Sequence, residues 1–160
     1  MHQQPRVFAR PTLSDRIAIG DLINGLGFYT DQCEWDLVEA GYAETVTTDY
    51  TCLFGGEPQT QPRSAVVASL RRVMRGFDFN QHLITTPDIQ MRDGDHAVAR
   101  SYVRATHRLG KSTWVLGGYY THELERRTSS WCITHVKFTL GYEEGDRALL
   151  AQAAERAGSP

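Results

Sequence analysis

Residues 96–142, HAVARSYVRATHRLGKSTWVLGGYYTHELERRTSSWCITHVKFTLGY, decide the fold of this chain. The stretch is rich in the β-branched and aromatic residues of strands, and apolar and polar side chains alternate through much of it. Gly110-Lys111 and Thr128-Ser129-Ser130 interrupt it and indicate turns. Because strands joined by short turns pair antiparallel, the stretch predicts an antiparallel sheet with the long strands His96–Arg108, Ser112–Arg127 and Trp131–Tyr142.

Further strands are predicted before this stretch. A period of two over Thr45–Phe54 places Val46, Thr48, Tyr50 and Cys52 on one face. Two shorter strands are predicted over Phe79–Thr85 and Ile89–Arg92, and Asp93-Gly94 is a hairpin turn signal. Gly117-Gly118 would let the sheet bend sharply.

Helices are predicted mainly in the first half of the chain. Thr12 and Asp15 can form a capping box, and the amphipathic run after them predicts a helix that ends within residues 25–30; its apolar positions are Ile19, Leu22, Ile23 and Leu26. Residues 55–62 are predicted to be a loop. The other expected helices cover Glu34–Tyr42, the segment from a capping Ser64 to Gly76, and Arg147–Arg156.

These elements predict one α+β domain over residues 12–160, preceded by a flexible lead-in over residues 1–11. The long antiparallel strands should make a strongly curved sheet, and the N-terminal helices should cover its apolar face. We expect a cone-shaped α+β barrel that encloses a ligand-sized pocket.

Composition narrows the classes of function. Hydrophobic residues make up 41% of the chain, and the formal net charge of −2 offers no basic surface for nucleic acid or an anionic membrane. No apolar run is long enough to span a membrane, and Met1–Thr12 lacks the features of a secretory signal. The three cysteines have no C-x-x-C spacing, which argues against disulfides and zinc. We therefore expect a cytoplasmic protein without a metal.

His82 and Asp31 are the first candidates for chemistry. His82 lies in mid-strand between apolar neighbours, so its ring should be at least partly buried. A neutral imidazole held by a carboxylate is a good general base near neutral pH. A core histidine bonded to a backbone carbonyl explains the same pattern, and Asp31 can equally be the N-cap of the second helix.

Other side chains could line the pocket. Tyr50 can either pack or donate a hydrogen bond to a substrate oxygen. His107 follows small residues on its strand face, as a pocket wall would require, although a solvent-exposed strand end is an equal alternative. Tyr119 and Tyr120 are adjacent, so only one faces inward. The remaining histidines lack any partner pattern and are expected at the surface: His96, His122 and His135. No metal-ligand spacing, phosphate loop or dinucleotide fingerprint is present.

Five short motifs resemble the SnoaL-like branch of the nuclear transport factor 2-like superfamily. They are residues 29–36 (YTDQCEWD), Asp49-Tyr50, Gln81-His82, Ala105-Thr106-His107, and residues 116–127 (LGGYYTHELERR) followed by Trp131. Within that branch the chain is most similar to scytalone dehydratase and hexachlorocyclohexane dehydrochlorinase. The resemblance covers roughly residues 12–145.

The resemblance implies a catalytic dyad of Asp31 and His82, with Tyr50 and His107 contacting substrate. The dehydratase has a tyrosine where this chain has Thr30, so Tyr29 is taken as a further substrate-binding candidate, together with Tyr119. The resemblance also implies a lyase without cofactor or metal that acts on a small hydrophobic or aromatic, polyketide-like molecule and assembles as a homo-dimer or homo-trimer. An isomerase or polyketide cyclase with the same base, and a non-catalytic binding domain, remain alternatives because the fold fixes no reaction.

Overall fold

The computed structural model describes residues 10–158, so most of the predicted lead-in over residues 1–11 lies outside the described residues. None of the helices in this range combines the length and hydropathy needed to cross a membrane. The elements follow one another as α1 (Leu13–Asp31), α2 (Trp35–Ala40), β1 (Tyr42–Asp49), α3 (Thr51–Phe54), β2 (Gln59–Pro62), α4 (Arg63–Met74), β3 (Phe79–Ile84), β4 (Asp88–Met91), β5 (His96–Leu109), β6 (Ser112–Arg127), β7 (Ser130–Gly145) and α5 (Leu149–Gly158).

The strands form one seven-stranded sheet in the order β2-β1-β7-β6-β5-β3, with β4 paired to β5. The three long strands predicted from residues 96–142 are confirmed as β5, β6 and β7, which pair antiparallel. One pairing differs from the antiparallel prediction, because β1 runs parallel to β7, with Thr48 opposite Val136. Parallel neighbours need a long connection, and here β2 to β6 and two helices intervene.

The sheet is strongly curved and does not close into a complete barrel, since β2 and β3 form its two ends. The predicted bend at Gly117-Gly118 coincides with a shift in the register between β6 and β7. A Cβ atom on Gly118 would lie 2.2 Å from the carbonyl oxygen of Thr139, so the backbones approach here more closely than a side chain would allow.

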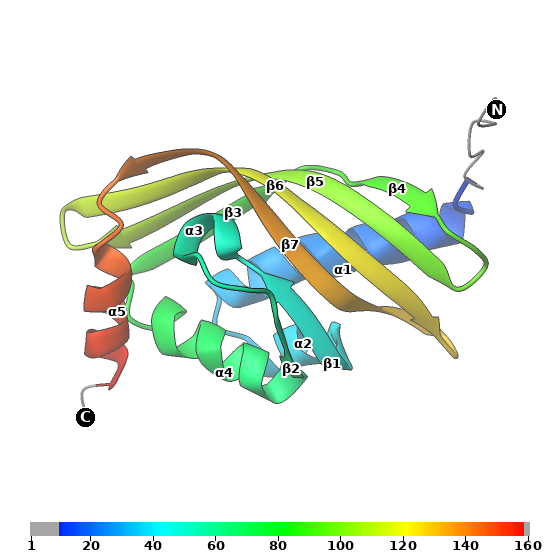
Figure 1. Ribbon diagram of the computed structural model, residues 1–160, viewed down its shortest axis with the longest axis horizontal. Helices are drawn as coiled ribbons and strands as arrows, with labels where there is room; N and C mark the ends of the chain where they lie inside the picture. The colour runs from blue at the N-terminus through cyan, green and yellow to red at the C-terminus, as the bar shows by residue number, and fades with distance from the viewer. Residues whose placement is uncertain (1–9, 159–160) are drawn as a thin grey trace.

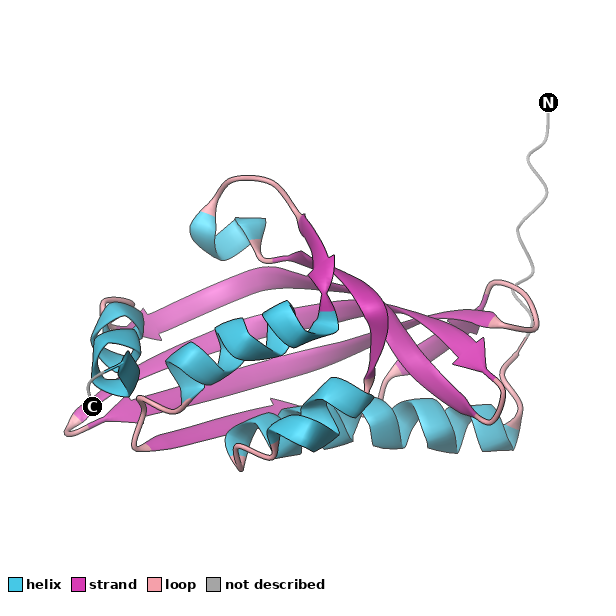
Figure 2. Cartoon of the chain, turned by 90° about the horizontal axis from the view of Figure 1, so that it is seen from below, coloured by secondary structure: helices cyan, strands magenta, loops and turns pink. Residues whose placement is uncertain are grey.

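The helices cover the concave face of this sheet. Figure 1 shows the long strands β5 to β7 across the top, α2 and α4 below them, and α1 running behind β7. Figure 2 shows α1 and α4 from below, lying along the strands, with α5 across the end of the sheet. The apolar stripe predicted for α1 is confirmed, since Ile19, Ile23 and Leu26 are buried in the main hydrophobic core.

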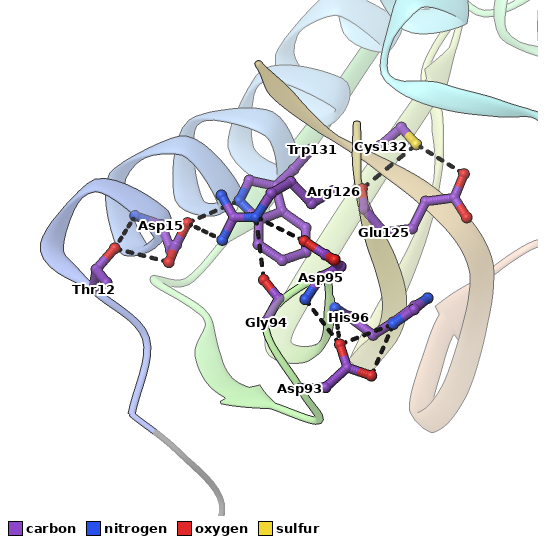
Figure 3. A network of polar contacts seen from close by, with 10 residues as sticks. All are labelled: Thr12, Asp15, Asp93, Gly94, Asp95, His96, Glu125, Arg126, Trp131 and Cys132. Carbon is purple, nitrogen blue, oxygen red and sulfur yellow. Dashed lines mark hydrogen bonds and ion pairs between the residues drawn. The ribbon is translucent and has the colours of Figure 1, made fainter. Parts of the chain in front are cut away.

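The first turn of α1 is fastened to the far end of the sheet through Asp15 (Figure 3). The predicted capping pair is confirmed, because the Asp15 backbone N–H and its carboxyl both contact the Thr12 hydroxyl. The same carboxylate accepts hydrogen bonds from Arg126 at 2.8 Å and from the Trp131 indole at 3.2 Å. Burial raises the pKa of Asp15, but these three hydrogen-bond partners outweigh burial and lower it.

Three local predictions are wrong. The strand predicted over Thr45–Phe54 ends at Asp49, because the Asp49 carboxylate accepts hydrogen bonds from the backbone N–H and hydroxyl of Thr51 and so turns the chain into α3. The predicted loop over residues 55–62 contains β2, which pairs with β1. Ser64 does not cap α4, whose N-cap is Pro62 and has no side-chain cap.

Candidate functional site

A cavity of about 510 Å³ lies between the concave face of the sheet and the helices α1, α4 and α5. This volume is typical of a small-molecule site. Most of the wall is apolar, and three histidines and three tyrosines supply polar atoms: His82, His107, His122, Tyr42, Tyr50 and Tyr120. Within residues 10–158, no aspartate, glutamate, lysine or cysteine lines the cavity, and its single arginine, Arg72, is exposed.

Asp31 and His82 are in direct contact at the wall of this cavity. The Asp31 Oδ1 atom lies 2.6 Å from His82 Nδ1, and Oδ2 accepts a hydrogen bond of 2.7 Å from the His82 backbone N–H. The two side chains are 8% and 11% exposed, so the pair is shielded from water. Because an ionised carboxylate can only accept, Nδ1 carries the proton and the Nε2 atom of the neutral ring is left as a base.

The position of Asp31 follows from the packing of α1 on β3. Gly27 precedes Asp31 by one helical turn and therefore lies on the same face of α1. A Cβ atom on Gly27 would lie 2.6 Å from Ile84 and 3.4 Å from the Cβ atom of His82. The absence of a side chain lets α1 approach β3 closely, and this brings the aspartate at the end of the helix to His82.

His107 is a second imidazole beside the first. It pairs with Asn80 across β3 and β5, and its ring centroid lies 5.5 Å from that of His82. The Asn80 amide nitrogen donates to the carbonyl of Met74, so its Oδ1 atom is the partner of His107 Nδ1 at 2.7 Å. His107 Nδ1 therefore donates, and Nε2 can only accept. Burial, with repulsion from His82, lowers the pKa of His107 to about 3, so the ring is neutral at neutral pH.

Tyrosines form the middle of the cavity. Tyr50 lines it from the turn between β1 and α3, and its ring stacks on Phe138 at 6.2 Å between centroids. Burial and the neighbouring phenol of Tyr120 hold the pKa of Tyr50 well above its usual range. Burial likewise raises the pKa of Tyr120 to about 12. These phenols are therefore neutral hydrogen-bond donors.

Two of the expected site residues lie elsewhere. Tyr119 is on the opposite face of β6 from the cavity, where its ring packs against the exposed Tyr102, and Tyr120 takes the inward position instead. The alternation of side chains along a strand explains this correction, since Trp114, Leu116 and Tyr120 share the inner face. Tyr29 is partly buried against the main core and is not among the residues that line the cavity.

The surface position expected for His122 is wrong. His122 is 5% exposed and lines the cavity, whereas His96 is exposed and His135 is only partly buried. The alternation of side chains along β6 indicates this inward position, because His122 is two residues beyond Tyr120 and therefore lies on the same face of the strand. No group of three metal-ligating side chains occurs within the described part of the chain.

Comparison with known proteins finds one matching domain family and several similar solved structures. The model of the SnoaL-like domain matches residues 11–137. The protein Kfla4162 from Kribbella flavida has 28% sequence identity and a TM-score of 0.77, over 91% of this chain and 98% of that chain. No curated protein matches this chain.

Two more distant structures have the same fold. A proposed scytalone dehydratase from Novosphingobium aromaticivorans has 20% identity and a TM-score of 0.74, covering 84% of this chain and 89% of its own. The hexachlorocyclohexane dehydrochlorinase LinA-type3 from Novosphingobium barchaimii has 16% identity and a TM-score of 0.72, covering 84% and 92%.

Proposed function

Because the chain belongs to the SnoaL-like domain family, we propose that it is a cofactor-independent lyase of the dehydratase type. The observation that carries the proposal is the contact of 2.6 Å between Asp31 Oδ1 and His82 Nδ1, with the same histidine lining a largely apolar cavity. Of the three histidines that line the cavity, His82 is the one with a carboxylate partner among the described residues. The substrate class we propose is a small hydrophobic or aromatic, polyketide-like molecule.

In the proposed reaction, His82 Nε2 takes a proton from a substrate carbon next to a carbonyl. The electron pair of that C–H bond forms the new double bond as the C–O bond to the leaving hydroxyl breaks. The departing hydroxide takes a proton from the imidazolium, so water leaves and the dyad returns to its starting state. Asp31 fixes the ring tautomer and stabilises the imidazolium, a contribution of the type that general-base catalysis requires.

Tyr50 and His107 have complementary roles in this scheme. The Tyr50 hydroxyl donates to the substrate carbonyl, where negative charge develops as the proton is removed. His107 Nε2 can only accept, so it binds a hydroxyl of the substrate and leaves the proton transfers to His82.

Exchange of carbon-bound protons tests the base without knowledge of the natural substrate. The probe is 2-tetralone in D₂O, and NMR follows the loss of the signal from the protons next to its carbonyl. The wild-type protein should accelerate exchange, and His82→Ala should lower the catalysed rate by roughly 10²–10⁴-fold. The matched control is the exposed pair of Asp93 and His96, whose contact of 2.9 Å lies outside the cavity; His96→Ala should leave exchange unchanged.

Exchange by His82→Ala at the wild-type rate, or no acceleration by the wild-type protein, would contradict the proposal. Scytalone and hexachlorocyclohexane, which give the two relatives their names, are the first substrates to assay by mass spectrometry. Loss of about 18 Da identifies a dehydration, whereas an altered product of unchanged mass identifies an isomerase or cyclase. Binding without any exchange identifies a non-catalytic ligand-binding domain.

Assembly and location belong to the same proposal. We expect a homo-dimer or homo-trimer, which sedimentation equilibrium measures directly, and a cytoplasmic location.

A further inference from the structure

His122 is a buried histidine that the proposed reaction does not use. It lies on the inner face of β6, opposite Ala99 on β5 and Val136 on β7, and it lines the cavity. Its ring makes no hydrogen bond with any described residue, and its Nδ1 atom is buried without a partner. A buried polar group that lacks a partner costs stability, so such a group calls for a functional explanation.

A second unpartnered atom lies beside it. The hydroxyl of Ser101 is also buried without a hydrogen-bond partner. Ser101 pairs with Tyr120, and His122 pairs with Ala99, so Ser101 and His122 are diagonal neighbours across β5 and β6. The only two buried unpartnered side-chain atoms within residues 10–158 are therefore clustered at one place in the sheet.

This cluster is remote from the dyad. His82 pairs with Ala105, and Ala105 pairs with Leu116 on β6. From position 116 to position 122 a strand advances about 20 Å at about 3.3 Å per residue, and the curvature shortens the direct path. The wall between these two ends of the cavity includes Tyr120 and Phe138, which pair across β6 and β7. The cavity thus has a histidine near each end, and the rings of Tyr50, Tyr120 and Phe138 lie between them.

The charge state of His122 restricts what it can bind. Burial alone lowers the pKa of His122 to about 4, and no carboxylate or other charged group opposes burial. The ring is neutral at neutral pH, and a neutral imidazole has one donor and one acceptor nitrogen. It suits an alcohol, a phenol or a carbonyl, whereas a carboxylate or phosphate would be left there without a counter-ion.

We propose that His122 is a second ligand-binding residue, which holds an uncharged oxygen at the end of the substrate remote from the reacting carbon. The inference rests on the proposed function for the position of the reacting carbon, but the binding site itself does not depend on catalysis. It specifies an elongated, ring-containing ligand with an oxygen substituent at each end.

Binding of two matched probes tests this inference. The probes are 2-naphthol and 2,6-dihydroxynaphthalene, which differ by one hydroxyl at the opposite end of the ring system. For the wild-type protein, calorimetry should give the dihydroxy probe an affinity about 5-fold higher, the value of one net hydrogen bond. His122→Phe should abolish this preference, His122→Gln should retain part of it, and the control His96→Phe should retain all of it.

The unmodified protein provides an independent measurement. In ¹⁵N NMR spectra, the dihydroxy probe should shift the His122 ring nitrogens. Equal affinities of both probes for the wild-type protein, a preference that survives in folded His122→Phe, or unshifted nitrogens at saturation would each overturn the inference. Failure of both probes to bind would overturn it too. Because these measurements report binding alone, they can succeed even if the exchange assay shows that His82 is not a base.

Discussion

The two ends of α1 each carry a buried aspartate that reaches across to the sheet, but the two carboxylates have different partners. Asp15, in the first turn, is bound by the Thr12 hydroxyl, the Arg126 guanidinium and the Trp131 indole. Asp31, at the last residue of the helix, is hydrogen-bonded within residues 10–158 to the ring and backbone of His82 alone. Along the helix the two residues are about 24 Å apart at about 1.5 Å per residue.

The electrostatics of the helix separate the two roles. A carboxylate in the first turn is stabilised by the partial positive charge of the helix N-terminus, whereas one at the last residue faces partial negative charge. Helix stability therefore accounts for Asp15 but not for Asp31. The partner of Asp31 is a ring that opens onto the cavity, so we propose a structural role for Asp15 and a role in the proposed reaction for Asp31.

The largest effect is expected for a substitution of Asp31, at the C-terminal end of α1. Asp31→Asn removes the charge that stabilises the His82 imidazolium, so the catalysed exchange of 2-tetralone protons should fall by roughly 10²–10⁴-fold. The free energy of unfolding should change by less than about 1 kcal/mol, because the lost contact is offset by relief of the unfavourable charge at the helix C-terminus. Urea unfolding of the same samples measures the second quantity, and a large loss of stability would contradict the division of roles.

The second largest effect is expected for a substitution of Asp15, at the N-terminal end of α1. Asp15→Ala leaves the buried Trp131 N–H without an acceptor and removes one partner of the Arg126 guanidinium, which keeps its contacts with Gly94 and Asp95. The free energy of unfolding should fall by about 2–4 kcal/mol. Asp21→Ala, at an exposed position of the same helix, is the matched control and should have little effect. Exchange per folded molecule should persist in Asp15→Ala. A stable Asp15→Ala protein with no exchange would reverse the assignment of the two ends.

A third substitution gives His107 the same kind of partner that His82 has. Asn80→Asp gives His107 a carboxylate partner like that of His82, so the pKa of His107 should rise from about 3 by roughly one to three units. NMR titration of the ring measures the change, and Asn80→Ser is the uncharged control. An unchanged His107 titration would mean that the amide and the carboxylate are equivalent partners at this position.

Acid tests the two lowered pKa values without any substitution. The pKa of His107 is about 3 in the folded chain and 6.5 when unperturbed, so the unfolded chain binds more protons and stability falls as the pH drops from 6.5 towards 3. The loss is at most about 1.4 kcal/mol per pH unit. The pKa of Asp15 lies below its ordinary value of 3.8, so its stabilisation is present above that pH and is lost as the pH falls further.

Thermal unfolding between pH 6 and pH 3 measures how His107 and Asp15 each make stability depend on pH. The Tm of His107→Gln should decline less than that of the wild-type protein between pH 6 and pH 4, because the substituted chain has no imidazole to protonate on unfolding. The Tm difference between the wild-type protein and Asp15→Asn should stay constant there and shrink only below about pH 4. If the Asp15 contribution were lost at a higher pH than the His107 contribution, the lowered pKa values of His107 and Asp15 would be contradicted.

The elements could be predicted from the sequence wherever one period persisted over many residues. The long strands β5 to β7 and the apolar face of α1 are examples. The errors occurred where a single side chain redirects the backbone, as the Asp49 carboxylate does when it ends β1 and starts α3. A repeating pattern of apolar residues does not predict such a local hydrogen bond.

The site could be predicted in part. Motif resemblance paired Asp31 with His82, and their contact depends on the close approach at Gly27, which no pattern indicates. The inward positions of Tyr120 and His122 could have been found, because both have the same parity as the apolar Trp114 and Leu116 on β6. The partnership of His107 with Asn80 requires the register between β3 and β5, which the sequence leaves open.

The bonds at Asp15 also set the order in which the protein can be built. Asp15 contacts Arg126 and Trp131, which follow it in the chain by 111 and 116 residues. Contacts of such long sequence separation form late, because a large loop must close first. During synthesis, α1 therefore cannot be fastened in place until β6 and the start of β7 have left the ribosome. A chain truncated before Trp131 should consequently lack the indole that holds the first turn of α1 against the sheet, although Asp31 and His82 would already have been made.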